Sequence, residues 1–184
     1  GNLCNASPAA DGAPPLLTLD AEVELASVRG ARRLALSDFL RGPRQTALAA
    51  DELMTAVILP SAALAGRGTF VKLGARAHLV ISIAMAAVRL EVAEGRVSAA
   101  ALSLGACGPV ATRLPGIEAA LAGSDATPEA LAAAVTDAAV AEAVSPIDDI
   151  RADAAYRRRA AAEILRRALV AALAPSAAFR ETAA

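Results

Sequence analysis

The sequence predicts an α+β protein in which strands come first and most helices follow. Short apolar or alternating runs, separated by turn residues, fill the stretch 21–105, which is the pattern of β-strands. After Gly108-Pro109 the chain becomes rich in alanine and acquires capping residues and helical apolar spacing. Strands and helices that are segregated along a chain indicate an antiparallel sheet with helices packed on it, rather than alternating strand–helix units.

The composition fits a folded protein. The chain has 184 residues, enough for one domain or two small ones, and 56% of them are hydrophobic against 20% charged. Much of the apolar content is alanine and only 2% of residues are aromatic, so leucine, valine and isoleucine must supply the core. The net charge of −1 predicts no electrostatic attraction to nucleic acid. Almost every basic residue is arginine, and Lys72 is the only lysine.

The first forty residues predict a helix, a hairpin and a helical turn. The opening segment Gly1–Pro8 reads like the middle of a loop, so the chain is expected to be a piece of a longer protein. A short helix over 9–19 is interrupted by glycine and a Pro-Pro pair. The alternating run 21–28 and the run 31–36 are joined at a glycine turn, which predicts a β-hairpin. Ser37 is expected to cap a one-turn helix.

The middle of the chain predicts a second group of strands. A strand over 52–59 ends at a proline, and the small, flexible segment 61–68 marks a boundary between two parts of the protein. Three further runs read as strands of an antiparallel sheet, at 69–73, 81–92 and 97–105. The pair Glu94-Gly95 fits a tight turn between the last two. Because the second run begins with many alanines, a helical interpretation of its first half stays open.

The last third predicts helices. A short helix over 114–122 ends at a glycine. The sequence Thr127-Pro128-Glu129 has a capping hydroxyl, a first-turn proline and an early acid, and it predicts a helix that continues to about residue 144. Asp153 opens a final helix that continues to about residue 173. Residues 176–184 are expected to form a flexible tail.

Patterns typical of hydrolytic or metal-dependent active sites are missing. There is one histidine, His78, and neither an HExxH nor a CxxC spacing occurs. The pair Asp148-Asp149 is interpreted as a loop or helix-entry element. Cys4 and Cys107 match no metal spacing and are expected to be reduced thiols in a cytoplasmic protein. The sequence therefore predicts no catalytic residue, no metal site and no membrane span.

The opening residues resemble a flavin-binding motif. Gly1-Asn2, followed by Ser7-Pro8 and Asp11, is similar to the second such motif in the FAD-binding (medium) subunits of the xanthine dehydrogenase and carbon monoxide dehydrogenase family of molybdenum hydroxylases. A glycine lets the backbone approach a diphosphate closely, where its N–H groups bind the charge. The resemblance implies that Gly1, Asn2 and Asp11 contact FAD.

Three later segments match the same family in the same order. Glu52–Pro60 resembles a strand whose third residue, here Met54, contacts the flavin nucleotide. Phe70–Arg76 resembles a strand whose lysine reaches the flavin, and Lys72 falls on that position. The segment Ser145–Arg151, followed by Tyr156-Arg157, is similar to the closing signature of the family's C-terminal domain. The resemblance thus implies FAD-binding roles for Met54 and Lys72.

The resemblance also implies an architecture and a function. Residues 1–60 are expected to be the end of an FAD-binding domain, and 66–175 a C-terminal domain in which helices pack on a three-stranded antiparallel sheet. The function implied is electron transfer through FAD, from iron–sulfur clusters to an acceptor such as NAD or oxygen. The implied partners are an iron–sulfur small subunit, with [2Fe–2S] clusters, and a large subunit that carries the molybdenum cofactor.

Two other hypotheses stay open. The family's first flavin motif, a glycine-rich loop, is absent, so the chain alone is not expected to be active. It could instead be a cofactor-free structural module that docks on partner subunits. A free-standing enzyme with its own active site is the third hypothesis, and the missing nucleophile–base pair argues against it.

Overall fold

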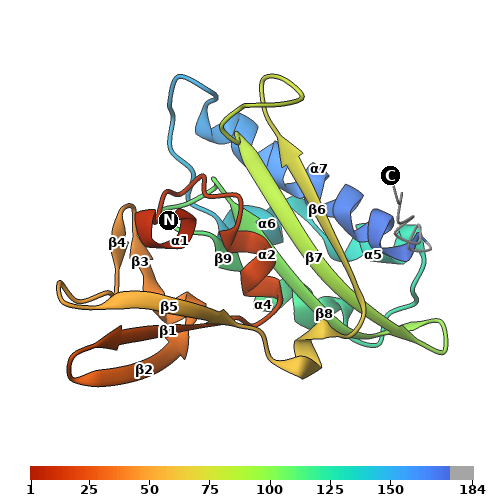
Figure 1. The fold of residues 1–184 in the computed structure, drawn as a ribbon. Helices are drawn as coiled ribbons and strands as arrows, with labels where there is room; N and C mark the ends of the chain where they lie inside the picture. The colour runs from red at the N-terminus through yellow and green to blue at the C-terminus, as the bar shows by residue number, and fades with distance from the viewer. Residues whose placement is uncertain (175–184) are drawn as a thin grey trace, which may run out of the picture.

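The computed structural model describes residues 1–174 and shows two groups of strands joined by the N-terminal helices (Figure 1). A large sheet, β6 to β9, has α7 on one face and α2 on the other. A smaller sheet of β1, β2 and β5 lies beside it, and α1 sits over the smaller group. The α+β prediction is confirmed, with helices packed on antiparallel sheets.

The smaller group is built from the first sixty residues. Strands β1 and β2 form the predicted hairpin, and β5 pairs with the other edge of β1. The expected cap on the one-turn helix is wrong, because that helix begins after Ala35 and Ser37 lies inside it. The elements are α1 (Asn2–Asn5), α2 (Ala13–Thr18), β1 (Glu22–Ser27), β2 (Gly30–Ala35), α3 (Leu36–Phe39), β3 (Leu40–Gly42), β4 (Gln45–Thr46) and β5 (Leu53–Ile58).

The larger sheet contains the three predicted strands. These are β6 (Arg67–Leu73), β7 (Ala84–Ala93) and β8 (Arg96–Gly105), all antiparallel to their neighbours. The prediction of three strands is incomplete, since the two-residue strand β9 (Thr112–Arg113) adds a fourth at the edge of β8. A pair this short leaves no periodic pattern that could be read from sequence. The segment 61–68, which the sequence predicts to be a boundary, holds a short 3-10 helix, η1 (Ser61–Leu64).

Residues 84–93 form strand β7 and not a helix, pairing with β6 and β8, and burial of both faces explains why the sequence does not alternate. Ala84, Ala86 and Val88 belong to the core that faces α7, and Met85 lies on the opposite face. A Cβ added to Gly105, on the neighbouring strand, would lie 2.8 Å from both Met85 and Pro14 side chains. Small residues in β7 and β8 therefore let α2 pack closely on the sheet.

Helices α4 and α7 pack on the other face of the larger sheet, and α5 and α6 pack against α7. Their bounds are α4 (Pro115–Leu121), α5 (Pro128–Ala134), α6 (Asp137–Ala143) and α7 (Ala154–Leu173). The single helix expected from 128 to about 144 is wrong: it breaks at Val135, and Thr136 then caps α6 by accepting from the amide of Ala139. Alanine propensity did not reveal this break, because a capping threonine can interrupt a run of helix formers. Asp153 caps α7 as predicted.

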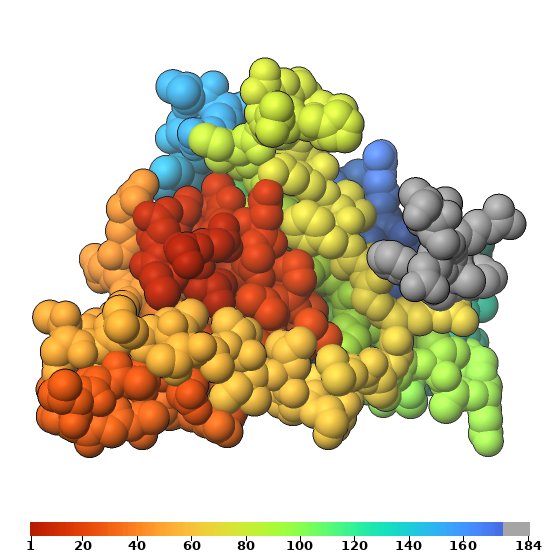
Figure 2. Space-filling model, in the orientation of Figure 1, coloured from red at the N-terminus to blue at the C-terminus, as the bar shows by residue number. Residues whose placement is uncertain are grey.

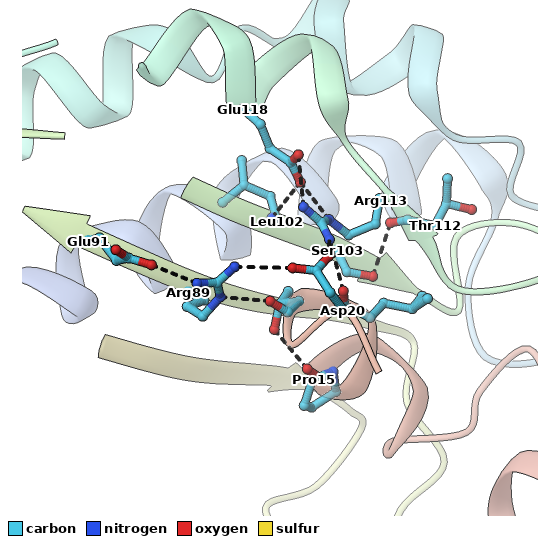
Figure 3. A network of polar contacts seen from close by, with 11 residues as sticks. Pro15, Asp20, Arg89, Glu91, Leu102, Ser103, Thr112, Arg113 and Glu118 are labelled. Carbon is cyan, nitrogen blue, oxygen red and sulfur yellow. Dashed lines mark hydrogen bonds and ion pairs between the residues drawn. The ribbon is translucent and has the colours of Figure 1, made fainter. Parts of the chain in front are cut away.

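Two arginines tie the end of α2 to the larger sheet (Figure 3). Arg89 of β7 donates to the Thr18 carbonyl at 2.8 Å, and Arg113 of β9 donates to the Leu17 carbonyl at 2.9 Å. Both arginines also reach the carboxylate of Asp20. The smaller group is thus joined to the larger sheet through α2 and the turn that follows it. Within residues 1–174, none of the helices is long and apolar enough to cross a membrane. The expected tail, 176–184, lies outside the described residues.

Candidate functional site

Residues 1–13 form a compact turn on the surface of the molecule, which we call the hook. Helix α1 ends at Ala6, whose φ of 44° lies in the left-handed region, and the chain then turns through Ser7 toward Asp11. The Asn2 side chain accepts from the Gly12 amide at 3.3 Å, which closes the hook. A Cβ on Gly12 would lie 2.9 Å from the Asn2 Oδ1, so only glycine fits there without a shift. Figure 2 shows this segment, in red, in the middle of one face of the molecule.

Asp11 is the contact point between the hook and the larger sheet. Its Oδ2 accepts from the Lys72 ammonium at 2.5 Å, and its Oδ1 accepts from the Ser82 hydroxyl at 2.7 Å. The Lys72 side chain is 29% exposed and that of Asp11 45%, whereas Ser82 is 1% exposed. Among the described residues Lys72 donates to Asp11 alone, so two of its three N–H groups are free for another acceptor.

Lys72 shares one face of β6 with Phe70, since alternate residues of a strand point to the same side. Val71 and Leu73 point to the other side and pack on the core beneath α7. Phe70 is 41% exposed and borders a groove of about 290 Å³ that α2 and η1 also line. This face of β6 therefore presents a cation and an apolar groove next to each other.

Met54 belongs to β5 and contacts the hook at α1. Its sulfur is 4.0 Å from the Cys4 sulfur, and its half-buried side chain packs on the core of the smaller group. Gly1 is the N-cap residue of α1, is exposed, and has open space where a Cβ would lie. Four of the five residues expected at the flavin site thus make contacts within or to the hook: Lys72 to Asp11, Asn2 to Gly12, and Met54 to Cys4.

The closing signature forms a buried clamp rather than an open site. The Arg157 guanidinium donates to the carbonyls of Ile83 and Ala106, both at 2.9 Å, and to the Asp149 carboxylate at 2.6 Å. Burial alone would raise the pKa of Asp149, but hydrogen bonds from Arg157 and from backbone amides outweigh it and hold that pKa at about 2. Asp148 accepts from the Ala154 amide at the start of α7, so both carboxylates serve the fold.

A cavity of about 440 Å³ lies next to this clamp. The hook lines one side through Pro8, and the segments that carry Ile81 and Ile147 line the other. Arg157 Nε is buried without a partner among residues 1–174. No cluster of three or more potential metal ligands occurs in that same range. Burial raises the pKa of the Cys107 thiol to about 11, so this cysteine is not an activated nucleophile.

Sequence reasoning did not identify Ser82 or Gly12 as members of the site. Gly12 follows the matched motif directly and could have been inferred from the need for a tight approach to Asn2. No sequence signal points to Ser82, which reaches Asp11 only because the connection between β6 and β7 returns to the same place.

Two protein families match the chain in succession. The FAD binding domain in molybdopterin dehydrogenase matches residues 1–62, and the CO dehydrogenase flavoprotein C-terminal domain matches residues 69–172. The nicotine 6-hydroxylase medium subunit of Paenarthrobacter nicotinovorans is 36% identical over 92% of this chain and 58% of its own length. The nicotinate dehydrogenase FAD-subunit of Eubacterium barkeri is 40% identical over 58% of this chain and 37% of its own length.

Solved structures show the same fold. Carbon monoxide dehydrogenase from Hydrogenophaga pseudoflava superposes with a TM-score of 0.86 at 29% identity, covering 94% of this chain and 59% of that one. Quinoline 2-oxidoreductase from Pseudomonas putida 86 gives a TM-score of 0.85 at 28% identity, with the same two coverages. The chain thus spans about three fifths of the length of these proteins' matching chains.

Proposed function

Because the chain belongs to the CO dehydrogenase flavoprotein C-terminal domain family, we propose that it supplies one half of the FAD site in an electron-transfer subunit of a molybdenum hydroxylase. The match of residues 1–62 to an FAD binding domain supports FAD as the cofactor. The observation that carries the proposal is the Asp11–Lys72 contact, because it brings a residue of each matched family to one exposed place.

The residues present fit this part of an FAD site. The close approach of Gly12 to Asn2 folds the hook tightly, and Gly1 leaves its surroundings open, as a backbone that binds diphosphate requires. Lys72 is partly exposed and retains free N–H donors, so an acceptor on a flavin ring can be bound without breaking its contact with Asp11. The apolar groove beside Phe70 offers a surface on which an aromatic ring system can pack.

Each residue would have a distinct role. Gly1 and Asn2 would bind the diphosphate, Met54 would contact the nucleotide, and Asp11 would hold Lys72 toward the ring. FAD, when bound, supplies reversible electron transfer. The Lys72 ammonium would place positive charge beside the ring and so favour its reduced, more negative form.

The relatives support further parts of the proposal. One is a medium subunit and another an FAD-subunit, as their names state. We place this chain likewise in a cytoplasmic complex with an iron–sulfur small subunit and a large subunit that holds the molybdenum cofactor. Electrons would pass from the clusters to an acceptor such as NAD or oxygen. Residues 1–60 would form the end of the FAD-binding domain, and 66–175 the domain that completes the site.

A second candidate function is a cofactor-free docking module. One observation favours it: β5 is an edge strand of its sheet, and it exposes 75% of Leu53 and 40% of Val57. Such an edge with exposed apolar side chains is a typical place for another chain to pack. Leu53 and Val57 point to the side of β5 opposite Met54, because alternate residues of a strand face opposite ways, so docking and FAD binding are separable by experiment.

The test is FAD binding by the purified 184-residue chain. The chain is mixed with FAD and desalted, and the visible flavin bands of the protein fraction are measured, with a dissociation constant from flavin fluorescence. We expect bound flavin, and we expect Lys72→Ala to weaken binding about tenfold or more, as for loss of a hydrogen bond from a charged group. Arg29→Ala, which changes an exposed charge on the β1–β2 turn, is the matched control.

A colourless protein fraction would contradict a flavin half-site that works in this chain and would favour the docking module. Adding the isolated small and large subunits to that colourless chain, followed by gel filtration, then measures docking directly. Equal FAD affinity in Lys72→Ala and in the unchanged chain would remove Lys72 from the site.

A further inference from the structure

Ser82 is a buried serine whose hydroxyl donates a hydrogen bond to Asp11. It is 1% exposed, and its Oγ donates to the Asp11 Oδ1 at 2.7 Å. A buried hydroxyl that lost this partner would carry the full cost of an unmet hydrogen bond. The contact therefore constrains Asp11 from the protein interior, on the carboxylate oxygen that Lys72 does not use.

Ser82 and Lys72 stand at the two ends of one connection. Lys72 is the next-to-last residue of β6, and Ser82 lies two residues before β7. The Ile83 amide donates to the Leu73 carbonyl at 2.8 Å, which closes the base of the connection. Above this base, Leu79 is 92% exposed. Asp11 thus spans the base of the connection with one carboxylate oxygen on each side.

This two-point contact differs from an ordinary surface ion pair. The Lys72–Asp11 pair alone is partly exposed on both sides, and such pairs hold a side chain weakly because both partners stay mobile. A second hydrogen bond, from a buried and immobile donor, fixes the carboxylate in one rotamer. The ammonium of Lys72 is then held toward the place where the hook and β6 meet.

We propose that Ser82 is a positioning residue for the FAD site, which fixes Asp11 and, through it, both the hook and the Lys72 ammonium. This inference rests on the proposed FAD function for its effect on the cofactor. Its effect on the hook does not depend on FAD, because the contacts exist in the chain by itself. The family motifs contain Asp11 and Lys72, whereas Ser82 lies within the matched C-terminal domain, residues 69–172, but outside the motif Phe70–Arg76.

The test combines Ser82→Ala with Asp11→Ala in a double-mutant cycle. Ser82→Ala deletes one atom and adds none, so it creates no clash in the interior. We expect it to weaken FAD binding about tenfold, the value for one hydrogen bond to a charged group. In the Asp11→Ala background the same change should cost less than about twofold, because Ser82 acts through Asp11. Ser82→Thr keeps the hydroxyl and should retain most of the affinity.

A cofactor-free measurement accompanies the cycle. Amide hydrogen exchange of the hook, at residues 10, 12 and 13, should speed up about tenfold in Ser82→Ala, since the loop then opens locally. Ser103→Ala is the matched control: Ser103 is also buried and donates its hydroxyl at 3.0 Å, but to the Thr112 carbonyl. It should change neither the hook exchange nor the FAD affinity.

The outcomes separate this inference from the proposed function. If the unchanged chain binds no FAD, the function fails in this chain, and hook exchange still decides the role of Ser82. Unchanged hook exchange in Ser82→Ala would overturn the inference. So would an equal loss of FAD affinity with and without Asp11, because Ser82 would then act by another route.

Discussion

Replacing Asp20 with asparagine removes the one negative charge on which Arg89 and Arg113 converge (Figure 3). Asp20 follows α2 and has a φ of 49°, in the left-handed region. Asparagine tolerates that region as aspartate does, and it has nearly the same volume. The substitution therefore tests the charge, with little change in backbone strain or packing.

The expected loss of stability depends on the ion pairs that Arg89 and Arg113 keep when Asp20 is replaced. The Asp20 carboxylate accepts from Arg113 at 2.6 Å but lies 3.3 Å from Arg89, so the first contact carries most of the effect. Each arginine keeps one glutamate, at 2.7 Å in both cases. A hydrogen bond between charged groups contributes about 1.5–3 kcal/mol, and the half-exposed Asp20 argues for the lower end. We expect a loss of about 1.5 kcal/mol, or about 4 °C in Tm for a chain of this size.

Urea unfolding followed by circular dichroism measures this loss. The control is Asp125→Asn, which removes the partner of Arg96 in a surface pair exposed by about two thirds on both sides. It should cost less than about 0.5 kcal/mol. The Asp20→Asn midpoint should fall with an unchanged m value. Equal midpoints for the two variants would refute the reasoning that Asp20 joins α2 to the larger sheet.

Three further predictions concern other paired or buried groups. Hydrogen bonds from Arg32 and a backbone amide hold the pKa of Glu52 at about 2, below its ordinary 4.5, so its stabilising effect is complete above pH 4.5 and is lost as the pH falls toward 2; urea midpoints of Glu52→Gln should depend less steeply on pH across that range. Ellman's reagent should modify Cys4 quickly and Cys107 slowly, because burial raises the pKa of Cys107, and Cys4→Ser should abolish the fast phase. Arg157→Met should cost about 2–4 kcal/mol in urea unfolding, since it leaves the buried carbonyls of Ile83 and Ala106 without this donor, while Asp149 keeps its backbone amides and Arg151; a loss below about 1 kcal/mol would contradict the clamp.

Local signals predicted much of the fold. The alternation of 21–28 fixes which side chains of β1 are buried, and Val23 and Leu25 are fully buried as that pattern requires. The capping role of Asp153 is equally local, since its carboxylate needs only the amide of Tyr156. The strand β9 pairs with residues of β8 only eight to ten positions earlier, but two residues are too few to show a strand pattern. The break at Val135 involves a distant residue as well as the cap at Thr136, because the Val135 carbonyl accepts from Arg166 at 3.0 Å.

The site was predictable in its parts but not in its assembly. The resemblance to a family implies one shared cofactor for Asp11 and Lys72, which lie sixty-one positions apart in the sequence. That they contact each other, and that Ser82 contacts Asp11, follows from the way α2 docks on β7 and β8. The alanines and glycines where α2 meets β7 and β8 carry no functional group. Only the packed structure therefore shows that their small size lets α2 approach the sheet closely.

The same docking links cofactor binding to stability. Residues 1–20 provide the proposed diphosphate and Lys72 contacts, and they also provide the carbonyls and the carboxylate that Arg89 and Arg113 bind. A ligand that binds only the folded protein stabilises it in proportion to the logarithm of its concentration over its dissociation constant. Asp20→Asn weakens the contacts of Asp20 with Arg89 and Arg113 and should therefore weaken FAD binding from a distance. Added FAD should recover part of the stability that this variant loses. If FAD raises the Tm of Asp11→Ala as much as that of the unchanged chain, the hook and the cofactor are not coupled.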